Sequence, residues 1–246
     1  MRIPRVFHSS PLKGKDRVML DAAAAKHVVT VLRLKPGAEL TLFDGSGFEF
    51  AAVLEHQADK KQAWVKITQM HGPVVESPLQ VTLVQGVSRG ERMDYTIQKA
   101  VELGVAAIVP VLTERSVVKL DKDGGAKKRE HWQAVAVSAC EQSGRVKVPA
   151  VHAPLRYLEY LASKPEGDLK LLLDPLGGVT AGVLPRPADG KALLLVGPEG
   201  GLSENEINLA ARVGFQGLKL GPRILRTETA ALVALSLLQA SWGDLD

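Results

Sequence analysis

The fold is decided by one stretch in the C-terminal third of the chain, Leu193-Leu194-Leu195-Val196-Gly197-Pro198-Glu199-Gly200-Gly201-Leu202-Ser203. The apolar run at its start predicts a buried strand, and Ser203 with Glu206 matches a capping box, which predicts a helix from about Glu204. The turn between them contains three glycines, which let the backbone approach a ligand closely and present bare N–H groups. A tight connection that binds nothing has the same composition, so this stretch alone leaves both interpretations open.

A second stretch, residues 218–229 (LKLGPRILRTET), repeats the order of strand, Gly-Pro turn and helix, with Thr227 as the expected N-cap residue. If the two strands are neighbours, their Gly-Pro loops form one rim. Arg223 and Arg226 lie where the turn meets the helix, which favours binding of an anionic ligand. The alternative is that they are surface arginines or form ion pairs, for example with Glu228.

Apolar runs alternate with helical patterns throughout the C-terminal part of the chain. The expected strands are Val81–Val87, Ala107–Val111, Leu169–Leu173, Ala192–Val196 and Gly217–Leu220, and the expected helices are Met93–Gly104, Lys127–Gln142 and Thr227–Ala240. This alternation predicts a mostly parallel α/β sheet, in which ligands bind beyond the C-terminal ends of the strands.

Residues 1–72 predict a separate, small β-rich domain. Asp21 is suited to cap a helix over Ala22–Leu34, and the remaining segments are extended. The expected strands are Ile3–His8, Leu40–Phe43, Phe48–Leu54 and Gln62–Gln69. Several strands with one helix suggest a small barrel, and the proline-containing stretch 71–78 is expected to link it to a second domain, 73–246.

Charge and cysteine content narrow the class of protein. Residues 1–38 contain eight basic and two acidic residues, which is compatible with a phosphate-binding surface or with scattered surface lysines. The single cysteine, Cys140, cannot form an internal disulfide, and we recognise neither a secretory leader nor an apolar run long enough to span a bilayer. We therefore expect a cytoplasmic protein with no membrane partner. The six histidines lack metal-ligand spacing, and we see neither a Walker loop nor a dinucleotide fingerprint.

Two more loops carry candidate residues. In Ser88–Met93, Arg89 precedes a helix and could hold phosphate, while Glu91 suits the first helical turn. In Cys140–Arg145, the basic Arg145 follows a glycine at a helix end. Helix capping accounts for both patterns equally well.

Seven segments in a fixed order give the chain a recognisable pattern. They are MRIPRVF (1–7), SRGERM (88–93), QKAVELGV (98–105), ERSVVKL (114–120), CEQSGR (140–145), VGPEGGLS (196–203) and LGPRILRTETA (220–230). On these segments the whole chain resembles the SPOUT-class methyltransferases, most closely the small-subunit (16S) ribosomal RNA uridine-N3 methyltransferases of the RsmE family. The resemblance implies an N-terminal PUA-like barrel, a trefoil-knotted α/β domain with a mostly parallel sheet, a homodimer, S-adenosylmethionine as cofactor, and 16S ribosomal RNA of the small subunit as partner.

The resemblance also implies site residues. The cofactor would be held by the loops Leu172–Leu176, Val196–Gly201 and Leu220–Arg226, that is by Leu172, Leu173, Val196, Gly197, Pro198, Glu199, Gly200, Gly201, Leu220, Gly221, Arg223, Ile224 and Leu225. The expected catalytic residues are Arg226, Arg89, Glu199 and Glu228, with either glutamate as the base. The expected RNA-binding residues are Arg2, Arg5, Lys13, Lys15, Arg17, Arg33, Arg89 and Arg145, and no metal is expected.

Two other functions remain as alternatives. A SPOUT enzyme that methylates a ribose 2′-hydroxyl of ribosomal or transfer RNA shares the fold class, although its motifs differ from CEQSGR and RILRTET. A ribosome-assembly factor that kept the fold without catalysis is the second alternative, and it need not bind S-adenosylmethionine.

Overall fold

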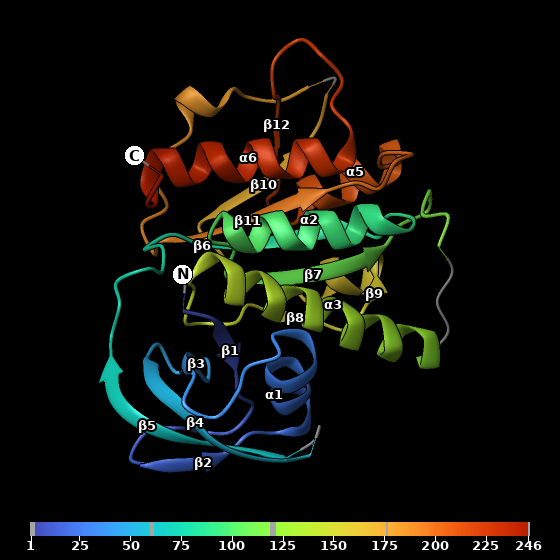
Figure 1. Cartoon of the computed structure of the whole chain (residues 1–246). Coiled ribbons are helices and arrows are strands. Elements are labelled where there is room, and N and C mark those ends of the chain that lie inside the picture. The colour runs from blue at the N-terminus through green and yellow to red at the C-terminus, as the bar shows by residue number, and fades with distance from the viewer. Residues whose placement is uncertain (1–2, 60–61, 119–121, 176, 246) are drawn as a thin grey trace. The chain divides into compact units, whose positions relative to one another are not determined.

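The structure is a computed structural model that describes residues 3–59, 62–118, 122–175 and 177–245 (Figure 1). The chain forms two compact units. The barrel unit consists of Met1–Glu76 together with Cys140–Val148, and the sheet unit consists of Ser77–Ala139 together with Pro149–Asp246. The barrel unit therefore includes a short segment that lies far along the chain.

The barrel unit is built on a five-stranded, barrel-like sheet in the order β1-β3-β4-β5-β2. Its strands are β1 (Arg5–Phe7), β2 (Arg17–Met19), β3 (Glu39–Phe43), β4 (Glu49–Asp59) and β5 (Gln62–His71). Only the pair β1–β3 is parallel. Alternate apolar residues such as Leu40, Leu42 and Leu54 point into one core together with Val28 from the helical segment. The short β2 has no alternation long enough to be predicted.

The helix of the barrel unit differs from its prediction. Asp21 caps α1 (Ala22–Lys26) as expected, because its carboxylate accepts hydrogen bonds from the backbone N–H groups of Ala23 and Ala24. The α-helix does not continue to Leu34, since residues 27–31 form a π-helical turn. This turn contains the run Val28-Val29-Thr30-Val31, and β-branched side chains fit poorly in an α-helix.

The sheet unit confirms the predicted parallel α/β architecture. Its strands follow the order β12-β10-β11-β6-β7-β8, and the short β9 also pairs with β7. Every pair in this sheet is parallel. The strands are β6 (Gln80–Gly86), β7 (Ala107–Leu112), β8 (Ala150–Val151), β9 (Leu155–Arg156), β10 (Leu169–Leu173), β11 (Lys191–Val196) and β12 (Gln216–Leu218). Because β11 and β12 both flank β10, the loops after these three strands meet at one edge of the sheet.

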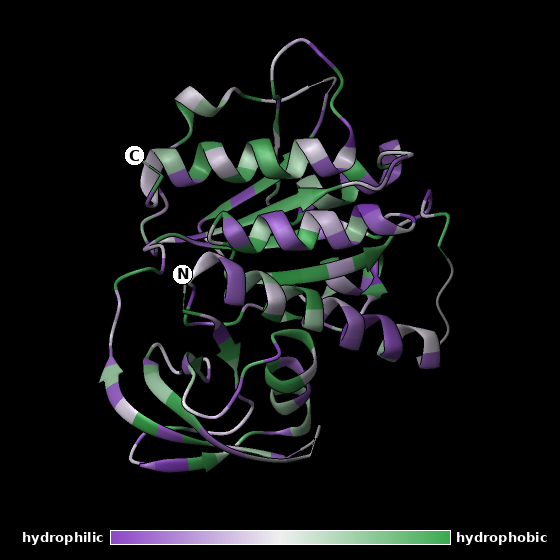
Figure 2. Cartoon of the chain, viewed as in Figure 1, coloured by the Kyte–Doolittle hydropathy of each residue, from purple (hydrophilic) through white to green (hydrophobic). Residues whose placement is uncertain are grey.

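Helices cover both faces of this sheet, whose central strands are strongly apolar (Figure 2). They are α2 (Glu91–Glu102), α3 (Lys122–Ser143), α4 (Tyr157–Ala162), α5 (Glu204–Arg212) and α6 (Thr227–Trp242), with a 3-10 turn at Ala181–Val183. Helices α2 and α6 lie side by side, and α6 packs on β6 and β11 (Figure 1). Helices α4 and α5 supply Tyr157, Tyr160 and Ala210 to a second cluster, formed with Leu193 and Leu195 of β11.

The described part of the chain contains no helix with both the length and the apolar character that a bilayer-spanning segment needs.

Candidate active site

The loops that follow β10, β11 and β12 enclose a cavity of about 580 Å³. It opens at the C-terminal ends of the parallel strands, where α/β sheets bind their ligands. The loop after β11, Gly197–Leu202, and the segment 220–228 supply most of its lining. The two glycine-rich stretches recognised in the sequence therefore face one space, as expected. The expectation that they follow neighbouring strands is wrong, because β10 lies between β11 and β12.

Hydrogen bonds tie both ends of the segment 219–226 to the loops after β10 and β11. At its start, the backbone N–H of Lys219 donates to the carbonyl of Val179 at 2.9 Å. At its end, the hydroxyl of Thr227 donates to the carbonyl of Gly197 at 2.6 Å and accepts from the amide of Gln85 at 2.9 Å.

Thr227 does not have its predicted role as N-cap of α6. Arg226 occupies the N-cap position, and its side chain makes no capping hydrogen bond. The Thr227 hydroxyl instead bonds the Gly197 carbonyl and so ties the start of α6 to the end of β11. Gln85, which is fully buried at the end of β6, completes this link and was not singled out from the sequence.

Three glycines shape the turn after β11. A Cβ atom on Gly86 would lie 2.5 Å from the nitrogen of Pro198, and a Cβ atom on Gly197 would lie 3.1 Å from the carbonyl carbon of Gly201. Gly201 has a φ of +69°, a conformation that side chains disfavour. The turn is thus a closely packed backbone cradle. Gly86, the last residue of β6, packs directly against this turn, and the sequence showed it only as a glycine within the expected strand Val81–Val87.

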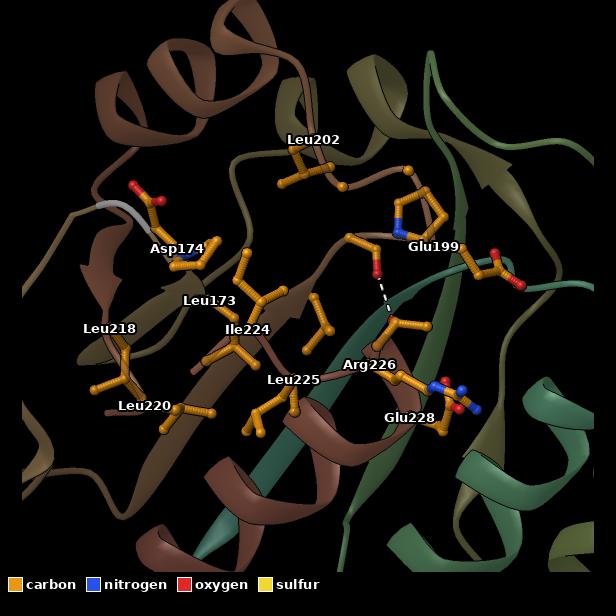
Figure 3. Close-up of a pocket in the computed structure, with 18 of the residues that line it drawn as sticks. Leu173, Asp174, Glu199, Leu202, Leu218, Leu220, Ile224, Leu225, Arg226 and Glu228 are labelled. Atoms are coloured by element: carbon orange, nitrogen blue, oxygen red, sulfur yellow. Dashed lines mark hydrogen bonds between the residues drawn. The ribbon is translucent and has the colours of Figure 1, made fainter. Parts of the chain in front are cut away.

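The cavity has an apolar side and a polar side. Leu173, Leu218, Leu220, Ile224 and Leu225 gather at one side, where Asp174 is the charged residue beside them, whereas Glu199, Arg226 and Glu228 lie at the other (Figure 3). Ile224 is 84% exposed, which is unusual for a large apolar side chain and fits a wall that a ligand would cover.

The surroundings of Glu199 favour its ionised form. One carboxylate oxygen accepts hydrogen bonds from the backbone N–H of Arg89 at 3.0 Å and from the guanidinium of Arg92 at 2.9 Å. Partial burial favours the neutral form, but these hydrogen bonds and the charge of Arg92 outweigh it and lower the pKa of Glu199. A carboxylate with a lowered pKa is a weak proton acceptor.

Glu228 differs from Glu199 in its surroundings. It lies in the first turn of α6 and lines the cavity. Its Oε2 atom is buried and has no hydrogen-bond partner among the described residues. A buried carboxylate oxygen without a donor is costly, so a hydrogen-bond donor that reached this atom would be stabilising.

Most of the predicted cofactor residues line the cavity. Leu173, Val196, Gly197, Pro198, Glu199, Gly200, Gly201, Leu220, Gly221, Arg223, Ile224 and Leu225 all do so. The exception is Leu172, whose side chain is 2% exposed and packs in the core, because alternate residues of β10 face opposite sides of the sheet. Leu176, at the end of the first predicted loop, lies outside the described residues.

The predicted catalytic residues are only partly brought together. Arg226, Glu199 and Glu228 line the cavity, whereas Arg89 does not, and its contact with Glu199 comes from its backbone. Two arginines that were not predicted, Arg92 and Arg115, line it instead.

The predicted RNA-binding residues fall into two groups. Lys13, Lys15, Arg17 and Arg33 are exposed on the barrel unit, and Arg89 is exposed on the sheet unit. Arg2 lies outside the described residues.

The predictions for Arg5 and Arg145 need correction, because Arg145 is buried, Arg5 is mostly buried, and both side chains form ion pairs within the barrel unit. Arg145 donates two hydrogen bonds to one carboxylate oxygen of Glu76, at 3.1 and 2.7 Å, and its side chain is 9% exposed. Arg5 pairs with Glu49 and also donates to the carbonyls of Gly144 and Arg145. These arginines join Cys140–Val148 to the barrel and offer little charge to a partner.

No group of three His, Cys, Asp or Glu side chains that could hold a metal ion occurs among the described residues.

Comparison with known proteins defines the class of the two units. Residues 75–239 match the family described as RNA methyltransferase domain, and residues 20–68 match the family described as RNA methyltransferase PUA domain.

Relatives then define the particular family. The chain is 34% identical over 245 residues to the ribosomal RNA small subunit methyltransferase E of Buchnera aphidicola subsp. Schizaphis graminum, covering 99% of this chain and 98% of that protein. It is also 34% identical over 217 residues to the protein of the same name from Bacillus subtilis, covering 85% of this chain and 84% of the relative. The chain belongs to the ribosomal RNA small subunit methyltransferase E family.

Solved structures agree with this membership. A putative methyltransferase from Legionella pneumophila, solved with the bound cofactor SAM, is 42% identical with a TM-score of 0.94, and the similarity covers 100% of both chains. The ribosomal RNA small subunit methyltransferase E of Neisseria gonorrhoeae, bound to S-adenosyl methionine, is 41% identical with a TM-score of 0.92, again over 100% of both chains.

Proposed function

We propose that this chain transfers a methyl group from S-adenosylmethionine to N3 of a uridine in 16S ribosomal RNA of the small subunit. The observation that carries the proposal is the cavity between the three loops, with an apolar side and a side formed by Arg226, Glu228 and Glu199. Membership in a family whose solved members hold this cofactor supports the assignment.

The residues of the cavity suit S-adenosylmethionine. A volume of about 580 Å³ lies within the range of roughly 300–1,000 Å³ that is typical of small-molecule sites. The turn Gly197–Gly201 and the segment 220–225 would hold the nucleoside through their backbone groups, with Leu173 and Ile224 against its apolar surfaces. When bound, the cofactor supplies a methyl group that its positively charged sulfur has already activated.

The chain's own residues then have to make N3 of the uracil able to accept the methyl group. N3 of uracil carries a proton, which must leave before or during methyl transfer. Glu228, which lines the cavity, is our candidate to accept this proton, and the Arg226 guanidinium would stabilise the negative charge that develops on the uracil. The lowered pKa of Glu199 argues against that residue as the proton acceptor. Its hydrogen bonds to Arg89 and Arg92 give it a positioning role instead.

The exposed cations of the barrel unit provide the surface for RNA. In this proposal residues 1–72 form the RNA-binding domain and residues 73–246 the methyltransferase domain. Lys13, Lys15, Arg17 and Arg33 contact the phosphate backbone, and Arg89 adds a contact from the sheet unit. RNA affinity that falls as salt concentration rises is the expected signature.

The same proposal includes a homodimer in the cytoplasm. Val233 and Leu237 on α6 are 37% and 39% exposed, and a second copy of the chain would cover them. Ribosomal RNA as substrate supports the cytoplasmic location. Size-exclusion chromatography with light scattering tests the dimer, and a monomeric mass at micromolar concentration would contradict it.

Nucleoside analysis tests the methyl transfer. The protein is incubated with S-adenosylmethionine and with either free 16S RNA or small subunits, and the digested RNA is examined by mass spectrometry. The expected product is a uridine methylated on the base. A ribose-methylated nucleoside would support the 2′-O alternative instead, and a protein that does not bind the cofactor would support the assembly-factor alternative.

The Arg226→Ala variant separates catalysis from cofactor binding. It should bind S-adenosylmethionine like the wild type and transfer no methyl group. Arg212→Ala serves as the matched control, because Arg212 is an exposed arginine at the end of α5 that does not line the cavity. Normal turnover in Arg226→Ala would remove this arginine from the mechanism.

A further inference from the structure

We propose that Arg92 and Arg115 form a phosphate-binding site at the rim of the cavity, which holds the RNA backbone next to the target nucleotide. This inference rests on the proposed function, because it assigns part of the RNA contact to the sheet unit. Both arginines line the cavity, and they come from different elements of that unit.

Arg92 is positioned by the loop that follows β11. It is the second residue of α2, and its guanidinium donates to Glu199 at 2.9 Å. The same carboxylate oxygen accepts from the backbone N–H of Arg89 at 3.0 Å, so Glu199 fixes both the arginine and the start of its helix. The side chain of Arg92 remains 48% exposed, which leaves part of its guanidinium accessible to a partner.

Arg115 is positioned by the next residue of the same loop. Its guanidinium donates to the carbonyl of Gly200 at 3.1 Å, and a Cβ atom on Gly200 would lie only 3.1 Å from the Arg115 Cβ. The loop that carries Arg115 is anchored nearby, because the N–H of Glu114 donates to the buried Glu206 at 2.9 Å. Gly200 therefore allows the close approach that brings Arg115 to the rim.

The chemistry of these two side chains fits phosphate. A guanidinium has five N–H donors in a planar fork that matches phosphate oxygens, and each of these arginines donates one hydrogen bond to the loop. Because the two acceptors belong to consecutive residues, Glu199 and Gly200, both cations lie at one edge of the cavity. Glu199 offsets one of the two positive charges, which leaves a net charge that favours an anion.

Pre-positioning distinguishes this pair from ordinary surface arginines. A free arginine loses conformational entropy when it binds phosphate, whereas Arg92 and Arg115 are already held by contacts within the sheet unit. The contacts come from the loop that is proposed to hold the cofactor. The cofactor loop and the RNA-facing arginines thus share the turn Glu199–Gly200.

The test compares Arg92→Gln, Arg115→Gln and the double variant with the wild type, and uses Arg212→Gln as the control. RNA affinity is measured directly by filter binding at several salt concentrations, and S-adenosylmethionine affinity is measured by calorimetry. Methyl transfer gives KM for RNA and kcat. Each single variant should weaken RNA binding about tenfold, as expected for a lost charge-assisted contact, and should reduce the salt slope by about 0.7–0.9.

The expected pattern is a KM for RNA that rises much more than kcat falls, together with the reduced salt slope. A merely structural role would change cofactor affinity or thermal stability and leave the salt slope unchanged. RNA affinities and salt slopes like those of the wild type in both single variants would overturn the site. Because filter binding does not depend on turnover, a protein that binds RNA through these arginines but transfers no methyl group would overturn the proposed function alone.

Discussion

Replacing Gly86 with alanine should damage the cofactor site, although Gly86 does not line the cavity. An added Cβ would lie 2.5 Å from the nitrogen of Pro198, 2.6 Å from its Cδ and 2.8 Å from the carbonyl carbon of Gly197. Non-bonded heavy atoms normally lie about 3.5–4.0 Å apart, so something must move by about 1 Å.

The movement falls on the loop rather than on the strand. β6 is held on both sides by parallel pairing, with Gln85 opposite Val196 and Gly86 opposite Val111. Overpacking of this kind costs about 1–3 kcal/mol. In a chain of this size 1 kcal/mol lowers Tm by about 2–4 °C, so the expected decrease is about 2–12 °C. A loop displaced by about 1 Å should also bind S-adenosylmethionine at least about tenfold more weakly, which corresponds to about 1.4 kcal/mol.

Thermal unfolding and calorimetry measure the two effects. Gly125→Ala in α3 is the matched control, because a Cβ atom at Gly125 meets nothing within 4 Å and its φ is not in the left-handed region. That substitution should leave cofactor affinity unchanged and stabilise the helix by up to about 1 kcal/mol. A Gly86→Ala variant with the Tm and cofactor affinity of the wild type would refute the reasoning.

Three other substitutions or reactions test further parts of the site and core. Glu228→Gln should lower turnover about 100-fold or more with cofactor affinity within about twofold, and an unchanged kcat would exclude this carboxylate as proton acceptor. Glu199→Gln should lower Tm at neutral pH, because the lowered pKa means that the folded state favours the charged carboxylate. This difference should shrink as pH falls below about 4 and through that lowered pKa, and a difference that does not shrink with pH would contradict the assignment. Burial raises the pKa of Cys140 to about 12. The folded protein should therefore not react with a thiol reagent at mildly alkaline pH, whereas the unfolded protein should. Rapid reaction of the folded protein would contradict the burial of Cys140.

The sequence predicts best those parts of the fold that local chemistry specifies. The strand-turn-helix element around Gly197 is predicted because an apolar run, three glycines and a capping box agree with one another, and Ser203 and Glu206 form that box in the structure. The strands β2, β8 and β9 have only two or three residues, so they carry no periodic signal. The π-helical turn at His27–Val31 follows from a β-branched run whose effect on geometry is hard to anticipate.

Candidate residues were hardest to predict where a partner lies far along the chain. In the sequence Arg145 cannot be told from an RNA-binding arginine, because its ion-pair partner Glu76 lies 69 positions away. Arg92 and Arg115 show the opposite case. They are indistinguishable from surface arginines in the sequence, and only their contacts with Glu199 and Gly200 bring them to the cavity rim.

A crystal structure of the protein with S-adenosylmethionine is the most direct test of the proposed site. We predict that the nucleoside lies between the turn Gly197–Gly201 and the segment 220–225, with its methyl group directed towards Arg226 and Glu228. A cofactor bound elsewhere, or a methyl group directed towards Leu218 and Leu220 on the apolar side, would contradict the proposal.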